Sequence, residues 1–445
     1  MLSEKSRPVI EATAAVVAEH MPEITPLFYA HMFEAHPELL DGVFSRANQR
    51  NGEQAQALAG SIVHFAVHLL ENPGTLPEAV LSRIAHKHTA LGIVEEQYPI
   101  VYENLFWAIG EVLGDAVTPA VADAWTEVYW LMADALIKIE KGLYAQQAND
   151  RMWTDWRVVA KEPTGNAAVT FRFEPADDTP QSRGRAGGYV SVRLKVEDGL
   201  RQCRQYSLSE KAESTTERVI TVKLDEGGEV SPMLIQNVEV GDVIELSNPY
   251  GDITLEDEDS TAPLVLATAG IGITPAAAIL DALAQQGSDR QVLFFHGDAS
   301  WEAVALREQV TESLAALPHG DARLFLGVRP EQDPEGVTTV EGVMHFDDVE
   351  LPRDGHYILC GPLAFMQSTR SKLIDAGVPV LIVGSPLARV GKHLVGLVGL
   401  LEGFLRRLVT RIAVGVMLHG EAAVSLFQLR LAGTALNAQH LVKIA

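Results

Sequence analysis

Apolar residues in the first third of the chain recur three and four positions apart, which is the period of an amphipathic helix. One such run comprises Leu58, Ile62, Phe65 and Leu69. Turn-forming residues separate the runs, at Pro37, Gly52, Pro73, Pro77 and Pro119. We find no alternation typical of a strand in this part of the sequence. The pattern therefore predicts an all-α domain of several helices over residues 1–148.

Near Trp153 the pattern changes to short segments rich in β-branched and aromatic residues. These segments lie at 157–159, 168–173, 189–196 and 218–224, with turn-forming clusters between them. Short strands at this spacing predict an antiparallel β-barrel over residues 153–259.

From Pro263 onward, apolar strand segments alternate with helix-like segments. The strand segments lie at 264–269, 291–297, 323–327 and 356–362. This alternation predicts an α/β domain with a doubly wound parallel sheet over residues 262–379. The expected fold class is thus multidomain: all-α, then barrel, then α/β.

Residues 380–445 have a different composition, with no Asp, two Glu and seven Lys or Arg. The net charge of this tail is near +5, whereas that of the rest of the chain is near −29. A frameshifted end explains the abrupt change, and we favour it on composition. The alternative is a native basic, apolar tail that contacts a membrane surface or a partner.

The net charge of −24 argues against nucleic-acid binding, because an acidic surface repels phosphate backbones. The two cysteines, Cys203 and Cys360, cannot form a disulfide framework and lack metal-binding spacing. We find no signal peptide and no apolar run of about 18 residues that would span a membrane. These features favour a cytoplasmic protein.

One histidine has the setting of an axial haem ligand, which needs an apolar helix face beside it. His88 is in helical register with Leu81 and Ala85. His64 and His68 are four apart, a spacing that can bind metal, but nothing else supports that pair and we interpret them as ordinary helix residues.

Two polar residues on apolar helix faces stand out as further candidates. Tyr29 lies among aromatic residues, and Glu140 lies with Leu136 and Tyr144. A carboxylate in such a place should have a partner. The alternatives are a core tyrosine with a bonded hydroxyl and a boundary glutamate whose head reaches water.

Residues 28–33, 44–54, 84–91 and 96–98 closely resemble the globin domain of bacterial flavohaemoglobins. The segment Arg204-Gln-Tyr-Ser resembles the flavin signature of ferredoxin-reductase-like proteins, and Gly270-Ile-Gly-Ile-Thr-Pro follows a strand and opens a helix, as dinucleotide-binding loops do. The resemblance covers about residues 1–379.

The resemblance implies a haem site in the helical domain, with His88 as the proximal ligand. It implies that Glu140 and Tyr98 bond the far nitrogen of that histidine, which raises its basicity. On the distal side it implies Tyr29, Gln54 and Leu58, with Phe44 packed on the ring and Lys87 near the haem edge. Tyr29 would donate a hydrogen bond to bound oxygen.

The resemblance also implies two nucleotide sites. For FAD it implies Tyr189, Arg204, Gln205, Tyr206, Ser207, Gly228 and Ser231. For NAD(P)H it implies Gly270, Ile271, Gly272, Ile273, Thr274, Pro275, Cys360, Gly361 and Pro362. The chain departs from the family pattern at Ala186, Gly188 and Ile273, where Pro, Gln and Gln are usual, and it lacks the family's closing strand and C-terminal aromatic segment.

The implied activity is that of a nitric oxide dioxygenase, an oxidoreductase in which NAD(P)H electrons pass through FAD to haem b, where O2 and NO give nitrate. No obligatory protein partner is implied. A reductase acting on peroxides or quinones is one alternative, and a gas-binding sensor or oxygen store is another. Without the closing strand we expect the sheet to lack its edge, so that haem binding survives and reductase turnover is impaired. The choice between NADH and NADPH and the oligomeric state stay open.

Overall fold

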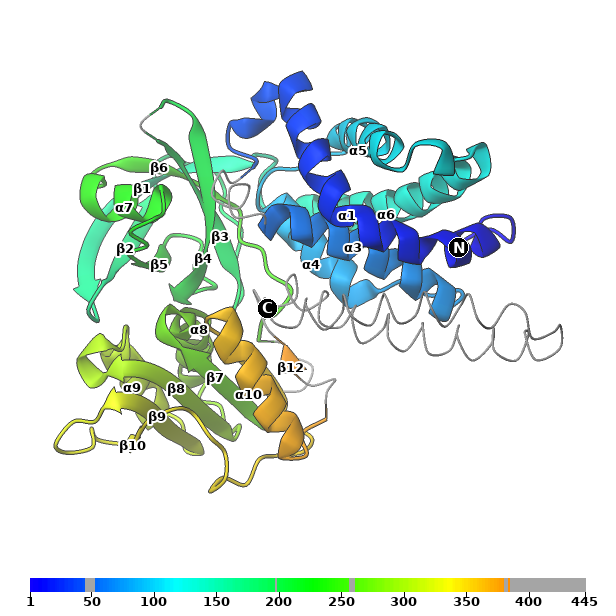
Figure 1. The fold of residues 1–445 in the computed structure, drawn as a ribbon. Helices are drawn as coiled ribbons and strands as arrows, with labels where there is room; N and C mark the ends of the chain where they lie inside the picture. The colour runs from blue at the N-terminus through cyan, green and yellow to red at the C-terminus, as the bar shows by residue number, and fades with distance from the viewer. Residues whose placement is uncertain (45–52, 197, 256–260, 380–382, 385–445) are drawn as a thin grey trace. The chain divides into compact units, whose positions relative to one another are not determined.

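The N-terminal part of the chain folds into helices (Figure 1). This computed structural model describes residues 1–44, 53–196, 198–255, 261–379 and 383–384. The helices are α1 (Arg7–Ala35), η1 (Pro37–Leu40), α3 (Glu53–Glu71), α4 (Glu78–Thr89), α5 (Gln97–Leu113), η2 (Gly114–Ala116) and α6 (Pro119–Ala145). The predicted all-α domain is confirmed.

Local sequence explains where the last of these helices begins. Thr118 is the N-cap of α6, and its hydroxyl accepts a hydrogen bond from the Val121 amide at 3.4 Å. Pro119 follows in the first helical position, where its missing amide hydrogen costs nothing. Tertiary packing then brings α6 against α4, and α1 against α3 and α5.

The second part is a closed antiparallel barrel with the strand order β1-β2-β5-β4-β3-β6. Its strands are β1 (Trp153–Thr164), β2 (Ala168–Pro175), β3 (Tyr189–Lys195), β4 (Arg201–Glu210), β5 (Arg218–Lys223) and β6 (Val243–Ser247), and a short helix, α7 (Val230–Asn237), follows β5. The predicted barrel is confirmed. The sequence pattern did not reveal β4 and β6 as strands, because β4 is rich in polar residues and β6 has only five residues.

The third part is a parallel sheet with the strand order β10-β9-β8-β7-β11-β12. The strands are β7 (Leu264–Ala269), β8 (Val292–Ser300), β9 (Gly320–Val328), β10 (Thr338–Glu341), β11 (His356–Cys360) and β12 (Val383–Gly384). Helices α8 (Ile273–Gln285) and α9 (Arg307–Ala315) cover one face, and α10 (Leu363–Asp375) covers the other (Figure 1). The predicted parallel α/β sheet is confirmed.

One expectation about this sheet was wrong. We expected no strand beyond 356–362 at this edge, but β12 pairs in parallel with β11 through two residues, Val383 and Gly384. A pairing of this length supplies few backbone hydrogen bonds. The sheet therefore has an edge strand beside β11, but a very short one. The rest of the tail lies outside the described residues.

The barrel and the parallel sheet share one hydrophobic core. Buried residues of the barrel, such as Phe171 and Leu246, belong to the same cluster as Leu266 of β7 and Ile279 of α8. Burial of this shared apolar surface holds the two parts together.

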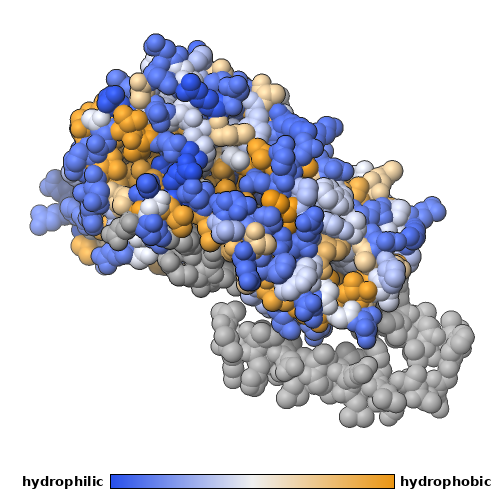
Figure 2. All heavy atoms as spheres, turned by 90° about the horizontal axis from the view of Figure 1, so that it is seen from above, coloured by the Kyte–Doolittle hydropathy of each residue, from blue (hydrophilic) through white to orange (hydrophobic). Residues whose placement is uncertain are grey.

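Exposed residues are mixed in character. Figure 2 shows hydrophilic residues with small hydrophobic patches between them on the face that it presents. Among the described residues, no helix is both long enough and apolar enough to cross a membrane.

Two substitutions on β6 test the position of the barrel core. Leu246 is fully buried, whereas the Val243 side chain is largely exposed. Leu246→Ala should lower the free energy of unfolding by about 2–5 kcal/mol, because it leaves a cavity. Val243→Ala should change it by about 0.5 kcal/mol or less. Urea unfolding followed by circular dichroism measures both, and equal losses would contradict this placement of the core.

Candidate functional site

Three helices each contribute one polar side chain to a cluster in the helical domain, in which Glu140 and Tyr98 are buried and His88 is half-buried. His88 comes from the last turn of α4, Tyr98 from the first turn of α5 and Glu140 from α6. Ala85 and Leu81, one and two turns before His88, are buried. The apolar face inferred from the sequence therefore does carry His88 into the domain.

Glu140 is the centre of this cluster. Its Oε1 atom lies 2.8 Å from His88 Nδ1 and accepts a hydrogen bond from the Tyr98 hydroxyl at 2.6 Å. The Tyr98 hydroxyl oxygen is also 3.2 Å from His88 Nδ1. An ionised carboxylate only accepts hydrogen bonds, so Nδ1 must carry the ring proton. The other ring nitrogen, Nε2, then keeps its lone pair for a metal.

The Glu140 side chain is only 3% exposed. A negative charge on this carboxylate is therefore stable only because two hydrogen-bond donors contact it. Burial, followed by the charge of Glu140, raises the pKa of Tyr98 far above its usual value. Tyr98 is therefore a phenol at any physiological pH, and it donates its proton to the carboxylate.

A group of aromatic rings lies on helix α1 and in the turn after η1. The ring centroid of Tyr29 lies 5.7 Å from that of Phe33 and 6.1 Å from that of Phe44, and Phe33 and Phe44 are 5.1 Å apart. Burial raises the pKa of Tyr29, so its hydroxyl keeps its proton. Aromatic surface with one phenolic donor is what a haem pocket that binds a polar diatomic ligand requires.

For the remaining predicted haem residues, the structure gives their position in the fold. Leu58 is half-buried on α3, and Lys87 is exposed directly before His88. Gln54 belongs to the first turn of α3, but its side chain lies outside the described residues.

Strand β4 carries the predicted flavin residues Arg204 to Ser207. Tyr189 on β3 pairs with Ser207, so the two lie side by side on adjacent strands. Within the described residues, the Arg204 Nη2 and Gln205 Nε2 atoms are buried and make no hydrogen bond. Buried donors normally have partners. The phosphate and carbonyl oxygens of a flavin nucleotide would supply them, so these residues fit FAD.

The second predicted flavin loop is a tight turn before α7. The Gly228 amide donates to the Asp225 carbonyl at 2.9 Å, and a Cβ at position 228 would lie 2.9 Å from Asp225 Oδ2. The Ser231 hydroxyl accepts from the Asp225 amide at 3.0 Å. Glycine thus lets the turn close at the start of the helix, where backbone amides can face an anion.

The nucleotide loop between β7 and α8 is built around two glycines. Gly270 has a φ of 52°, which favours glycine, and a Cβ on Gly272 would lie 2.3 Å from the Cys360 carbonyl oxygen. The Thr274 hydroxyl donates to the Ile271 carbonyl, and Ile273 and Pro275 are buried. The loop therefore brings the end of β11 beside the start of α8, at the carboxyl edge of the sheet, where nucleotides bind.

At the same edge, Cys360 ends β11, and Gly361 and Pro362 lead into α10. Position 273 holds a buried Ile, which offers no polar contact to a ligand. Ala186 and Gly188 are also buried, and a Cβ at 188 would lie within 3.0 Å of the Arg185 and Tyr250 carbonyl oxygens. A side chain at 188 would thus require this backbone to shift.

Sequence reasoning missed the residues that join α4 to the barrel. Arg83 donates to Asp252 Oδ2 through Nε at 2.9 Å and Nη2 at 2.8 Å. His86 Nδ1 accepts from the Gly251 amide at 3.0 Å. Burial lowers the pKa of His86, which suits this acceptor role. Such pairs leave no signal in the sequence, because their members lie far apart in the chain.

The fold and the site together define a globin joined to a flavin- and nicotinamide-dependent oxidoreductase. Residues 27–136 match the globin family, residues 155–255 match the oxidoreductase FAD-binding domain, and residues 266–371 match the oxidoreductase NAD-binding domain. The chain is 38% identical to a flavohemoprotein of Rhizobium meliloti and 39% identical to one of Bordetella pertussis. Each alignment covers 85% of this chain and 96% of the relative.

A solved structure agrees with these matches. The crystal structure of a flavohemoglobin from Malassezia yamatoensis with bound FAD and heme is 44% identical, with a TM-score of 0.81, over 86% of this chain and 98% of that chain. This chain belongs to the flavohaemoglobin family. Its cofactors are haem, FAD and a nicotinamide nucleotide.

Replacement of one histidine tests the haem site. His88→Ala should abolish the Soret absorption of the purified protein, because it removes the nitrogen that would bind the haem iron. His64→Ala, which changes another half-buried helix histidine, should leave the Soret band in place. A normal haem spectrum in His88→Ala would overturn this assignment.

The two cysteines allow a prediction about pH. Burial raises the pKa of Cys203 and of Cys360 from 9.0 to about 12. At pH 8 iodoacetamide should therefore modify neither thiol in the folded protein and both in urea, because the thiolate is the nucleophile. Above pH 9 the unfolded thiols ionise first, so stability should fall as the pH rises towards 12. Mass spectrometry counts the modified thiols, and labelling of the folded protein at pH 8 would contradict their burial.

Proposed function

We propose that this chain is a nitric oxide dioxygenase that uses NAD(P)H. The overall reaction combines two NO and two O2 with NAD(P)H to give two nitrate ions, NAD(P)+ and a proton. When bound, the nucleotide would supply a hydride, FAD would pass its two electrons on one at a time, and haem would supply the iron for the reaction of O2 with NO.

One observation carries this proposal: the carboxylate of Glu140 bonds His88 at Nδ1. The bond gives the imidazole partial imidazolate character and makes Nε2 a stronger donor to a metal. A strongly donating axial ligand favours oxygen chemistry over reversible oxygen storage. Tyr98 holds the same carboxylate in place through its own hydrogen bond.

On the distal side we assign Tyr29 as the hydrogen-bond donor to a ligand of the metal. Its pKa is raised by burial, so it donates a proton without losing it. Phe44 would pack against the ring, Leu58 and Gln54 would line the pocket from α3, and Lys87 would lie near the haem edge.

In the reductase part, Arg204 and Gln205 would hold the flavin nucleotide through their buried donors, and Tyr206, Ser207 and Tyr189 would contact its ring. Gly228 and Ser231 would form its second phosphate loop. The loop 270–275 would bind the nicotinamide nucleotide, with 360–362 beside its reactive end. Because all three cofactor sites lie in one chain, no protein partner is required, and O2 and NO are the substrates.

Product analysis tests this function. Under aerobic conditions with NADH, the protein should consume NO and form an equal amount of nitrate, as followed by an NO electrode and ion chromatography. Tyr29→Phe should lower the rate by about a hundredfold or more, the cost of removing one hydrogen-bond donor to the transition state. Tyr102→Phe removes a half-buried hydroxyl that bonds Thr126, and it should have little effect. Saturable NO uptake without nitrate would favour a gas-binding sensor or oxygen store.

The C-terminal tail provides a separate test of the reductase. Since β12 pairs with β11 through only two residues, we expect turnover of the reductase to be impaired while haem binding survives. A chain in which residues 380–445 are replaced by a family-like ending should reduce cytochrome c with NADH faster, at an unchanged haem content. Equal rates for the two chains would contradict this expectation.

A further inference from the structure

One strand of the barrel makes hydrogen bonds to both of the other parts of the molecule. Strand β4 begins at Arg201, carries the flavin residues 204–207 in its middle and ends at Glu210. Pairing with β3 on one side and β5 on the other keeps it extended. At about 3.3 Å per residue it spans roughly 30 Å.

The first end of β4 is bound to the helical domain by Asp41. The Arg201 amide donates to Asp41 Oδ1 at 2.7 Å, and Arg201 Nη2 donates to Asp41 Oδ2 at 2.6 Å. These hydrogen bonds from Arg201 lower the pKa of Asp41. Asp41 lies three residues before Phe44, the ring next to Tyr29. The start of the strand is therefore tied to the aromatic side of the haem site.

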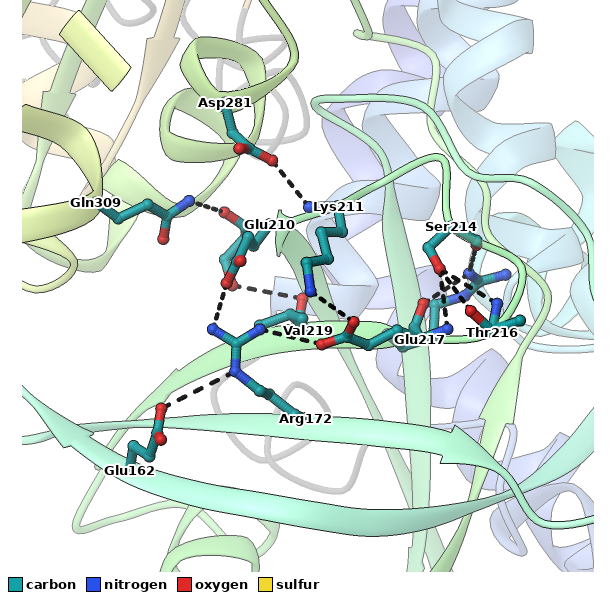
Figure 3. A network of polar contacts seen from close by, with 12 residues as sticks. Glu162, Arg172, Glu210, Lys211, Ser214, Thr216, Glu217, Val219, Asp281 and Gln309 are labelled. Atoms are coloured by element: carbon teal, nitrogen blue, oxygen red, sulfur yellow. Dashed lines mark hydrogen bonds and ion pairs between the residues drawn. The ribbon is translucent and has the colours of Figure 1, made fainter. Parts of the chain in front are cut away.

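The second end of β4 is bound to the NAD-binding domain. The Lys211 amide donates to Asp281 Oδ2 on α8 at 3.0 Å, and Gln309 on α9 donates to the Ser209 carbonyl at 2.8 Å. Figure 3 shows these contacts converging on the end of the strand. Helix α8 starts at the nucleotide loop, so Asp281 connects the flavin strand to the element that holds the nucleotide.

A salt-bridge network stiffens this second end. Arg172 on β2 bonds the carboxylates of both Glu210 and Glu217, and Lys211 Nζ lies 2.8 Å from Glu217 (Figure 3). Lys211 has a φ of 45°, which is uncommon for a residue with a side chain. Local conformation and charge thus combine to aim the Lys211 amide at α8.

We propose that β4 sets the position of the flavin relative to both of its electron-transfer partners, with Asp41 and Asp281 as positioning residues at its two ends. This inference rests on the electron route of the proposed function. Each carboxylate then controls one half-reaction. Asp41 governs transfer from flavin to haem, and Asp281 governs hydride transfer from the nucleotide to flavin.

The test uses full-length holoprotein mixed with NADH without oxygen, in a stopped-flow instrument that records flavin bleaching and the haem bands separately. Asp281→Ala should slow flavin bleaching by about tenfold or more and leave the later flavin-to-haem step unchanged, because small misplacements of reacting groups are costly. Asp41→Ala should slow only the flavin-to-haem step, by about threefold or more. Asp281→Asn keeps an oxygen acceptor for the Lys211 amide, so it should restore bleaching.

Asp177→Ala is a matched control. Asp177 also accepts a backbone amide, that of Thr179 at 2.9 Å, and a guanidinium, that of Arg151 at 3.1 Å, but it lies away from β4. This variant should leave both half-reactions unchanged. Hydrogen–deuterium exchange gives a readout that does not depend on turnover: Asp41→Ala should speed exchange at the Arg201 amide, and Asp281→Ala at the Lys211 amide.

The proposal would be overturned if Asp41→Ala or Asp281→Ala slowed both steps equally, or if neither variant slowed any step. Slowing of either step by Asp177→Ala would also overturn it. If the two steps separate as expected but no nitrate forms in the aerobic assay, the proposed function fails and the role of β4 stands. If nitrate forms and the steps do not separate, the role of β4 fails alone.

Discussion

A carboxylate buried in the core of the globin domain must be met by donors, and this requirement organises the cluster that we propose as the proximal side of the haem site. Glu140 lies on α6 and receives hydrogen bonds from His88 on α4 and Tyr98 on α5. An unpaired buried charge costs several kcal/mol, so a shift of any of the three helices would be strongly unfavourable. The same bonds fix the ring tautomer of His88 and so leave Nε2 with the lone pair that would bind haem iron in the proposed site.

The reductase depends on a different constraint, namely that a flavin must lie close to two partners at once. The barrel and the parallel sheet share one apolar core, which fixes their contact broadly. Directional bonds then align the barrel with both of the other parts: the Arg201 amide donates to Asp41 of the helical domain, and the Lys211 amide donates to Asp281 of the NAD-binding domain. Apolar burial supplies most of the attraction between the parts. Hydrogen bonds set how the parts are aligned, because only hydrogen bonds depend on angle.

Much of the architecture could be predicted from local pattern. The helical period, the short β-branched segments and the loop at Gly270 identified all three parts, since each depends on neighbouring residues alone. Strands β4 and β6 were missed. Strand β4 reads RQCRQYSLSE, with little β-branched character, and it is a strand because β3 and β5 pair with it on both sides. The two-residue β12 was missed because a pairing this short leaves no strand pattern in the sequence.

The sequence by itself determined the chemistry that is available: a histidine on an apolar face, a glutamate that needed a partner, a flavin tetrapeptide and a glycine loop. Only the tertiary structure decided which groups meet. Glu140 is 52 residues from His88, and Asp41 is 160 residues from Arg201. The spacing of residues along a helix or strand predicts contacts only within a few residues. Contacts at these larger separations depend on how whole elements pack, and the local periodicity of the sequence does not encode that packing.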